Sequence, residues 1–490
     1  MIDGNHSPRV LDDIPRDRQL PHLASLFNSR AMKQRLQERL FSTTDDRHPW
    51  IIQRCVVMQV HYTPESSCLI HYRLTVEQPA TGAKAEHLLY GCAFPVGRSH
   101  APWRTAYARE LVSSRFGPAL IHLPDVAMIL WSFPNDRTLH TLPAVIEAAH
   151  HTPEFLRDWV ASDLGSEWHI VKTTTQVVHY VGEQTCTVRT SIVCAHPEDP
   201  VHHTRTVFGT TYAKDAGTRT AHVMGQLWNS ASRRNGQFSV SQPLWYDAGL
   251  KTLWHRGTHG TMLDSQPIEY LTSTPVLMKV AHAVAAFHST SLTHLRARTK
   301  ANLMRRLETV GSLLLQCQPA CRAVLLPLLV RLTAQAKMIP VRPTATLHGR
   351  LCPDSLVLGK GMITVINLEH VCKGHPGQDL GSFIAGLLTW GVARQASLSQ
   401  IARHAQIFLD QYHQEVPWKV GQPVVAWFIA LALVTEHAYR CVTCLTSGRR
   451  GMVDTLLTLA DDIAKTRSLN SLAFGRTEMR RGHVTKRSPL

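Results

Sequence analysis

The sequence predicts an α+β fold in which two small β modules precede a mostly helical half. Three patterns predict it. From Ile51 onward, apolar residues alternate with a period of two, and turn residues separate the runs. The same order of runs then appears a second time. From about Pro275 the apolar residues take the spacing of helices instead.

The composition of the 490-residue chain is that of a globular protein with more than one domain. Hydrophobic residues make up 44% and charged residues 18%, which excludes disordered, collagen-like and coiled-coil chains. The 11 Cys are odd in number and scattered, so we expect reduced thiols and a cytoplasmic location. The start of the chain, MIDGNHSPRVLDDIPRDRQL, has no apolar run after a basic segment, so we expect no signal peptide.

The net charge of +16 favours anionic partners such as phosphate esters, nucleic acid or lipid headgroups. One dense basic cluster lies near the C-terminus, and we interpret it as a solvated end rather than a binding arm: Arg476, Arg480, Arg481, Lys486 and Arg487. The apolar stretch 424–435 is shorter than the ~20 residues that a spanning helix needs. We therefore expect a buried core helix there and no membrane span.

The first β module is expected at 51–150, after a helical N-terminal lead at 1–50 with its helix near 20–41. The runs CVVMQVHY and CLIHYRLTV flank the turn TPES and predict a hairpin, and HLLYGCAF predicts a third strand. A helix near 103–114 follows. The first module is thus predicted as a hairpin, a further strand and a helix, in that order.

The second β module is expected at 165–265 because the same order returns. KTTTQVVHY, CTVRTSIV and TRTVFGTTY predict three strands, and a helix follows near 217–229. Shifted by 118 positions, the two segments share seven residues: Val60/Val178, His61/His179, Tyr62/Tyr180, Glu65/Glu183, Cys68/Cys186, Pro79/Pro197 and Gly91/Gly209. Trp131 and Trp254 also fall in comparable places. We predict an internal repeat; the alternative is two unrelated hairpins that both use residue types suited to strands.

The helical half is expected at 270–470, followed by a basic tail at 471–490. Its predicted helices are 276–291, 295–315, 323–336, 379–392, 398–412, 424–444 and 452–466. Two short β runs, SLVLG and MITVINL, flank Lys360 and Gly361 and predict a tight hairpin within this half.

The most informative segment is 347–383, LHGRLCPDSLVLGKGMITVINLEHVCKGHPGQDLGSF. It resembles the aminoglycoside phosphotransferase and choline kinase superfamily, whose catalytic loop has the form HGDxHPxN and whose metal loop has the form IDFD followed by GDPxxDL. The matching residues are His348, Gly349, Pro353, Ile366, Gly374, Pro376, Asp379 and Leu380. YTPESSC, HYRL and LYGCAF are similar to the N-lobe hairpin and third strand of that family, and WSFPNDRTL resembles the segment that joins its lobes.

The resemblance implies a protein-kinase-like fold of the aminoglycoside phosphotransferase type, with a duplicated N-lobe-like module and a helical C-lobe. Phosphoryl transfer needs a carboxylate base, oxygen ligands for magnesium and usually a strand Lys for the nucleotide phosphates. The resemblance puts Arg350 in place of the catalytic Asp, and arginine stays protonated. It puts Ser355 and Asn367 at the metal-binding positions, and Cys92 or Thr210 at the position of the strand Lys.

These replacements predict a catalytically degenerate protein that binds a partner or an anionic or nucleotide ligand. Arg350 could pair directly with a phosphate or a carboxylate. Asp379 keeps an acidic position that is mainly structural in the family, and His348 is more often a packing residue of this loop than a base. We expect no metal site and no resident cofactor, and ATP without magnesium is the one nucleotide ligand that the resemblance leaves open.

Two alternatives are kept. The first is an active ATP-dependent small-molecule phosphotransferase with relocated carboxylates. In that case Glu369, Asp354 and Asp379 would be the available carboxylates. Glu369 follows Asn367 by two residues on one strand end and would face the same side. The second is a basic nucleic-acid-associated protein, which the scattered charge does not favour. The sequence names no protein partner.

Overall fold

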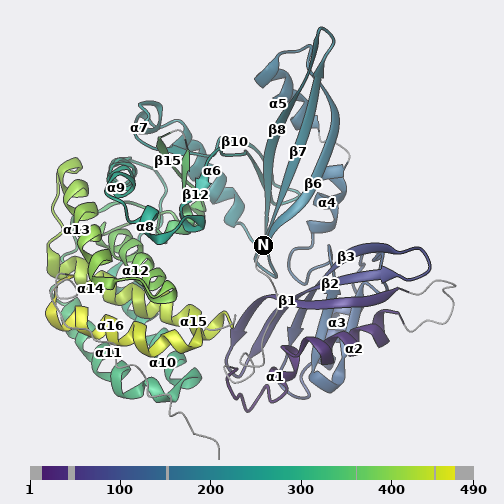
Figure 1. The fold of residues 1–490 in the computed structure, drawn as a ribbon, viewed down its shortest axis with the longest axis horizontal. Coiled ribbons are helices and arrows are strands. Elements are labelled where there is room, and N and C mark those ends of the chain that lie inside the picture. Colours follow the sequence, from purple (N-terminus) through teal and green to yellow (C-terminus); the bar gives the residue numbers. More distant parts are fainter. Residues whose placement is uncertain (1–13, 42–49, 151–153, 360, 446–448, 470–490) are drawn as a thin grey trace, which may run out of the picture.

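The computed structural model describes residues 14–41, 50–150, 154–359, 361–445 and 449–469 (Figure 1). The basic tail 471–490 and Lys360 lie outside these residues. The fold is α+β, as predicted: two antiparallel sheets lie on one side and a helical half lies on the other (Figure 1). We call residues from α1 to β5 the first module, those from α4 to β11 the second module, and those from β12 to α16 the helical half.

The first module is a five-stranded sheet with helices on one face. Its strands lie in the order β1 (Ile51–Thr63), β2 (Ser67–Gln78), β3 (Ala83–Ala93), β5 (Met128–Ser132) and β4 (Leu120–Leu123), and α3 (His100–Tyr107) connects β3 to β4. The short α1 (Leu23–Leu26) and α2 (Ser29–Leu40) cover one face of the sheet. Leu36 shares a buried cluster with Ile70 and Leu74, and the Tyr72 hydroxyl donates to the Leu26 carbonyl at 2.8 Å. The helical lead is therefore packed onto this sheet.

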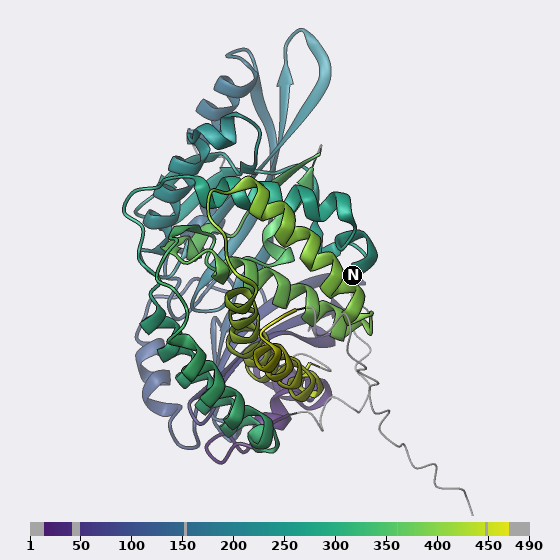
Figure 2. The same ribbon diagram turned by 90° about the vertical axis from the view of Figure 1, so that its left-hand side faces the viewer.

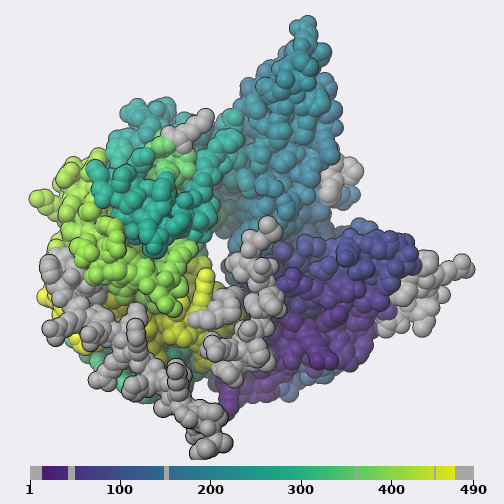
Figure 3. Space-filling model, in the orientation of Figure 1, coloured from purple at the N-terminus to yellow at the C-terminus, as the bar shows by residue number. Residues whose placement is uncertain are grey.

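The second module has the same plan. Its strands lie in the order β6 (His169–Val181), β7 (Thr185–His196), β8 (Asp199–Tyr212), β11 (Thr252–Arg256) and β10 (Pro243–Asp247). α6 (Ala216–Trp228) and the short α7 (Ala231–Arg234) connect β8 to the last strands. α4 (Leu142–His150) and α5 (Glu154–Leu164) cover one face, where Leu156 and Val160 pack with Val188 and Ile192. Figure 3 shows the long strands of this module projecting beyond the rest of the molecule.

The two sheets share most of their register as well as their strand order. Ile70 lies opposite Gly91 in the first module, and Val188 lies opposite Gly209 in the second. One detail of the sequence analysis is wrong: Trp131 lies opposite Tyr90, whereas Trp254 lies opposite Gly209. Tyr90 and Gly209 are not equivalent positions, so the two tryptophans differ by one step in register.

Each module is also built around one buried aspartate that the sequence analysis missed. Asp17 accepts hydrogen bonds from the Tyr62 hydroxyl at 2.8 Å and from the Glu65 amide at 2.7 Å. Asp136 accepts from the Tyr180 hydroxyl at 2.7 Å and from the Glu183 amide at 3.0 Å. Both aspartates lie in a P-x-D-R-x-L sequence, PRDRQL and PNDRTL, and this shared hexapeptide was a readable signal. A carboxylate that accepts four hydrogen bonds fixes the turn that begins each module.

The three parts of the molecule pack against one another, and α15 (Tyr439–Thr443) of the helical half also contacts β1 of the first module. The turn after β6 lies on the sheet of the first module, where the Gly182 amide donates to His71 Nε2 at 3.0 Å and the Tyr90 hydroxyl donates to Glu183. The sheet of the second module faces the helical half, where the Tyr212 hydroxyl donates to Glu369 at 3.3 Å. β9 (Ser239–Val240) of the second module also pairs in parallel with β15.

The helical half surrounds two small β elements (Figure 2). Its main helices are α8 (Ile268–Leu271), α9 (Thr274–Ser289), α10 (Lys300–Cys317), α11 (Arg322–Ala336), α12 (Gly377–Arg394), α13 (Leu398–Glu415), α14 (Gln422–Ala432), α15 (Tyr439–Thr443) and α16 (Val453–Thr466). β12 (Thr261–Met262), β14 (Leu356–Gly359) and β15 (Met362–Val365) join β9, while β13 (Ala345–Leu347) pairs with β16 (Cys372–Gly374). The predicted hairpin is β14 and β15.

One helical stretch of the described residues, Gln422–Thr443, is long and apolar enough to cross a membrane by length and composition alone. It joins α14 to α15 through the π-helical turn Leu433–Ala438. Since 78% of its most apolar window is buried inside the protein, it is placed as a core helix, as the sequence analysis expected. α10 and the stretch Pro319–Ala336 pass the same test only as one span, and they meet at a bend of 120°.

Candidate anion-binding site

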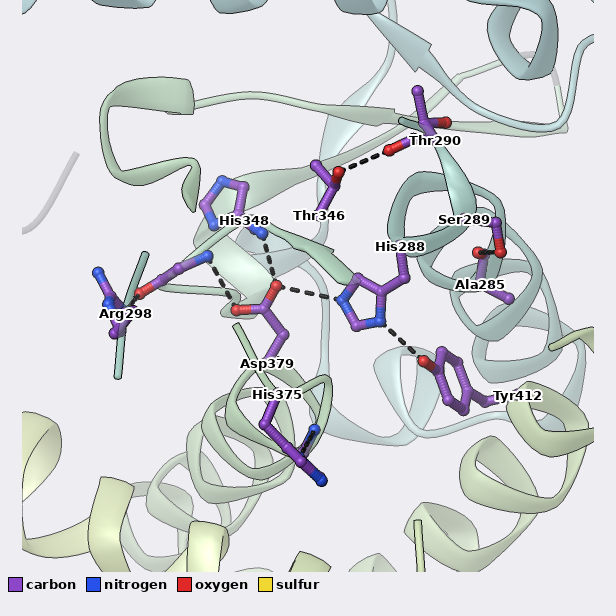
Figure 4. Close-up of polar contacts among 12 residues, drawn as sticks. Ala285, His288, Ser289, Thr290, Arg298, Thr346, His348, His375, Asp379 and Tyr412 are labelled. Atoms are coloured by element: carbon purple, nitrogen blue, oxygen red, sulfur yellow. Dashed lines mark hydrogen bonds and ion pairs between the residues drawn. The ribbon is translucent and has the colours of Figure 1, made fainter. Parts of the chain in front are cut away.

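Asp379 organises the loop that follows β13. Its two oxygens accept from the amides of His348 at 2.6 Å and Gly349 at 2.9 Å, and the same carboxylate lies 3.2 Å from His288 Nε2 (Figure 4). His288 Nδ1 in turn lies 2.8 Å from the Tyr412 hydroxyl. Burial by itself would raise the pKa of Asp379, but the contact with His288 and the amide bonds outweigh it, so the pKa is lowered. Asp379 therefore supports the loop from behind.

The two loops singled out by the sequence lie against each other. His348 Nε2 is 2.8 Å from the Ile366 carbonyl, and the Asn367 side chain donates to the Asp354 carbonyl at 3.3 Å. The backbone is sharply turned at both loops: φ is +83° at Gly349 and +62° at Asn367. A Cβ at Gly349 would collide with the carbonyl oxygen of His370, so only glycine fits where the loops meet.

Arg350 stands at the exposed side of this junction. Its side chain is half-buried, and no carboxylate oxygen among the described residues lies within 4.0 Å of its guanidinium. Ser355 is buried and is used locally, since its hydroxyl donates to the Arg350 carbonyl at 3.3 Å and lies 3.2 Å from Asp354 Oδ1. Asn367 is exposed. The structure thus brings Arg350, His348, Ser355 and Asn367 together.

The position of Glu369 differs from the expectation. Asn367 has a left-handed backbone conformation, and Leu368–His370 forms a 3-10 turn, so residues 367 and 369 do not alternate along a strand. The inference that they share one face is therefore wrong. Asn367 points to the Asp354 carbonyl, whereas the Glu369 carboxylate accepts from the Tyr212 hydroxyl of the second module.

Two further arginines lie beside Arg350, and the sequence analysis missed both. Arg298, in the segment between α9 and α10, donates through Nη1 to the Gly349 carbonyl. Arg219, on α6 of the second module, donates through Nη2 to the Glu369 carbonyl at 3.3 Å. No motif marks either residue, because each reaches the loops only through the packing of its element.

A buried acid that the sequence analysis also missed lies behind the loop. Glu436 belongs to the π-helical turn, a geometry that is often found at functional sites. Its Oε2 accepts from the Ser382 hydroxyl at 2.6 Å. Burial raises the pKa of Glu436, while the Ser382 hydrogen bond, Arg350 and Arg298 oppose that rise. The half-buried carboxyl is thus within electrostatic reach of Arg350.

The two residues at the expected strand-Lys positions lie in different surroundings. Thr210 is on β8, on the same strand face as Tyr212, and its hydroxyl is 3.0 Å from that of Thr187. Cys92 is on β3 and is 0% exposed in a cluster between the two modules. Burial raises the pKa of the Cys92 thiol to about 12. Thr210 therefore faces the loops of the helical half, and Cys92 does not.

The chemistry available at this site is mainly that of cations. Among residues 14–41, 50–150, 154–359, 361–445 and 449–469, no three His, Cys, Asp or Glu side chains come together in a way that could hold a metal ion. Arg298 and Arg219 donate to backbone carbonyls on the two sides of the Gly349–His370 contact, and Arg350 follows Gly349 directly. Such groups recognise phosphate and carboxylate oxygens.

Comparisons with known proteins give structural neighbours only. No family model matches the sequence, and no curated protein matches it. The aminoglycoside phosphotransferase APH(4)-Ia, as a thermostable mutant in its apo form, is 13% identical, covering 63% of this chain and 98% of that chain with a TM-score of 0.42. The choline kinase LicA from Streptococcus pneumoniae is 11% identical, covering 64% of this chain and 99% of that chain with a TM-score of 0.39.

A third solved structure is that of a choline/ethanolamine kinase family protein from Mesorhizobium loti. It is 11% identical, covering 65% of this chain and 98% of that chain with a TM-score of 0.38. By their names, these proteins are phosphotransferases and kinases of the superfamily that the segment 347–383 resembles. At such identities the likeness concerns the fold and leaves the chemistry of the site to be argued from its residues.

Proposed function

We propose that this chain is a catalytically degenerate protein of the aminoglycoside phosphotransferase type, which acts by binding an anionic or nucleotide ligand, or a protein partner. One observation carries the proposal. Arg350 occupies the position where the resemblance expects the catalytic aspartate, and within the described part of the chain no carboxylate lies within 4.0 Å of it. An arginine cannot accept the proton of an attacking hydroxyl.

The nearby acids have other partners, which supports the same proposal. Asp379 is buried and accepts from two loop amides. Glu369 accepts from Tyr212, and Asp354 lies beside Ser355. Because a divalent cation on phosphates needs freely presented oxygen ligands, ATP would bind here without magnesium if it binds. We also propose that the chain is cytoplasmic and that its two β modules are an internal repeat.

The test is thermal stabilisation of the full chain by ATP, measured in EDTA and again with magnesium. We expect a rise in Tm that is the same in both conditions and is lost in Arg350→Ala. Arg322→Ala is the matched control, because Arg322 is an exposed arginine at the start of α11. A rise that requires magnesium would contradict the proposal.

An active small-molecule phosphotransferase is the second candidate, and Glu436 is the observation that favours it. A carboxyl whose pKa is raised is suited to act as a general base near neutral pH. Under this alternative, ATP would be consumed on a panel of aminoglycosides and amino-alcohols. Turnover would stop in Glu436→Gln or in Glu369→Gln, and either result would overturn the binding proposal. The nucleic-acid alternative depends on the tail 471–490, which lies outside the described residues.

A further inference from the structure

Three arginines from separate segments of the chain converge beside one backbone contact. Arg350 follows Gly349 directly, Arg298 donates to the Gly349 carbonyl, and Arg219 donates to the Glu369 carbonyl next to His370. The near collision of a Cβ at Gly349 with the His370 carbonyl shows how close these backbone segments are. The Arg298 and Arg219 guanidinium groups are thus held on the two sides of one backbone contact, and Arg350 is the next residue along the chain from Gly349.

These positive charges lack close carboxylate partners. In the part of the chain that the structure describes, no Asp or Glu oxygen lies within 4.0 Å of any of the three guanidinium groups. Two acids of the neighbouring segments have their own hydrogen bonds, Glu369 with Tyr212 and Glu436 with Ser382. The pKa of His370 is lowered first by desolvation and then by Arg350, Arg298 and Arg219, which agrees with the convergence of the three arginines.

A polar hollow lies along α6 on the C-terminal side of Arg219, and none of the three arginines is among its lining residues. His222 and Gln226 lie three and seven residues after Arg219, so all three lie toward one side of the helix. The hollow has a volume of 720 Å³, and most of its lining groups are uncharged and polar. Its opposite wall is the end of α9 at Ser289–Ser291, where the Thr290 carbonyl accepts from Thr346, two residues before His348 (Figure 4).

We propose that Arg219, Arg298 and Arg350 bind the phosphate of a small phosphomonoester, without a divalent cation, and that the polar hollow along α6 receives its uncharged, hydroxyl-rich body. A sugar phosphate has this chemistry. The inference rests on the proposed function and narrows it from an anionic ligand to this class.

Physical chemistry supports this choice of ligand. Guanidinium groups bind phosphate oxygens through two parallel hydrogen bonds, and three of them replace the charge that a metal ion would supply. The amide, imidazole and hydroxyl groups of Gln226, Asn229, His222, Ser230, Ser232 and Ser289 can exchange hydrogen bonds with sugar hydroxyls.

The test is calorimetric titration of the full chain in EDTA with glucose 6-phosphate, inorganic phosphate and glucose. We expect glucose 6-phosphate to bind more tightly than phosphate and glucose not to bind. Arg219→Gln and Arg350→Gln should each weaken glucose 6-phosphate binding by about tenfold or more, because each removes charged hydrogen bonds. Arg322→Gln should leave the affinity unchanged.

A pair of variants at Arg298 separates binding from folding, and a variant at Gln226 tests the hollow. Arg298→Gln also removes the hydrogen bond to Gly349, so Arg298→Lys is measured beside it to retain the charge, with circular dichroism as the check of folding. Gln226→Ala should reduce the preference for glucose 6-phosphate over phosphate and leave phosphate binding unchanged. Equal affinities in the parent chain, Arg219→Gln and Arg350→Gln would overturn the inference, as would a strict requirement for magnesium.

The outcomes for this inference and for the proposed function are distinguishable. If ATP stabilises the chain without magnesium and glucose 6-phosphate does not bind, the sugar-phosphate inference fails and the proposed function stands. If the chain transfers phosphate from ATP in a Glu436- or Glu369-dependent reaction, the proposed function fails whatever the titrations show.

Discussion

The two modules have the same strand order, and in each a buried aspartate, Asp17 or Asp136, is hydrogen-bonded to the hairpin turn. We call these residues the two aspartate hubs. The corresponding faces of the two sheets nevertheless have different neighbours. In the first module this face carries Leu69, Cys92 and Ile129, and it packs against Tyr180 and Cys186 of the second module. In the second module the equivalent face carries Thr187 and Thr210, and the Tyr212 hydroxyl on it reaches Glu369.

This difference shows that the neighbour, and not the sheet itself, decides what a module can do. The face of the first module is closed by packing against the second module. The face of the second module is polar and lies over the loops that carry Arg350. We interpret the first module as the support that holds the second module in place. Four predictions follow from the comparison, in order of decreasing effect.

The largest contrast is expected when a lysine is placed at the two equivalent strand positions. Cys92→Lys puts an ammonium group into a fully buried apolar cluster, so it should cost about 3–5 kcal/mol or prevent folding. Thr210→Lys should cost less stability, because the long side chain of lysine can place its ammonium group toward Glu369. Thermal unfolding of both variants, with Cys92→Ser and Thr210→Ser as controls, measures the difference. Equal tolerance at both positions would show that the two faces are not distinct.

The next effect concerns the two aspartate hubs. Asp136→Ala leaves unpaired the Tyr180 hydroxyl and the amides of Glu183, Thr138 and Leu139, which should cost about 3 kcal/mol. Asp17→Ala removes the same kind of contacts, but its disruption should stay within the first module. Amide hydrogen exchange should therefore speed up across the junction of the modules only in Asp136→Ala. Asp136→Asn keeps an acceptor oxygen and should lose less stability.

A pH effect of similar or smaller size is expected at His71, where the modules meet. Burial lowers the pKa of His71 from 6.5 to about 4, and its Nε2 must stay unprotonated to accept from Gly182. Between these values the unfolded chain binds a proton that the folded chain does not. The stabilisation by the neutral ring is therefore complete above pH 6.5 and is lost as the pH falls toward 4, by on the order of 3 kcal/mol at most.

The measurement for His71 has to be local, because other buried histidines titrate in the same range. Amide exchange at Gly182 should speed up between pH 6.5 and 4 in the parent chain. His71→Gln keeps an acceptor oxygen without a titrating ring, so its exchange should depend less on pH. The same pH dependence in both chains would rule out His71 as the cause. The equivalent residue of the second module, Arg189, is exposed.

The smallest contrast separates the two hairpin glutamates. Glu183 accepts from Tyr90 and pairs with Arg137 at 2.7 Å, whereas Glu65 is exposed. Glu183→Gln should cost about 1 kcal/mol, because it weakens a partly buried ion pair and a hydrogen bond. Glu65→Gln should leave the melting temperature unchanged. A larger loss from Glu65→Gln would reverse the inferred roles of the two turns.

Much of the site could be predicted from the sequence because its residues lie close together in the chain. The motif spacing placed Arg350, His348, Ser355 and Asn367 in two neighbouring loops, and hydrogen bonds join those loops. The resemblance gives Asp379 a mainly structural position, and in the structure its carboxylate accepts from two loop amides. The prediction for Glu369 was wrong because it assumed that strand alternation continues past Asn367, where the chain instead forms a tight turn.

Arg219, Arg298 and Glu436 could not be predicted, because they come from distant parts of the chain with no motif of their own. The duplicated P-x-D-R-x-L hexapeptide could have been read, and it would have extended the repeat to the helices before each sheet. The sequence analysis assigned PRDRQL to the helical lead at 1–50, so this hexapeptide was not compared with PNDRTL.

By itself, the amino-acid sequence determined the α+β class, the two strand patterns and the non-acidic residues Arg350, Ser355 and Asn367 of the two loops. These features depend on local spacing, on side-chain periodicity and on residue chemistry, which a linear chain displays directly. Only the tertiary structure decided which sheet face is closed, which carboxylates have other partners and which arginines meet at Gly349. Those outcomes depend on how whole elements pack against each other, and packing brings together residues whose separation along the chain carries no information about their contact.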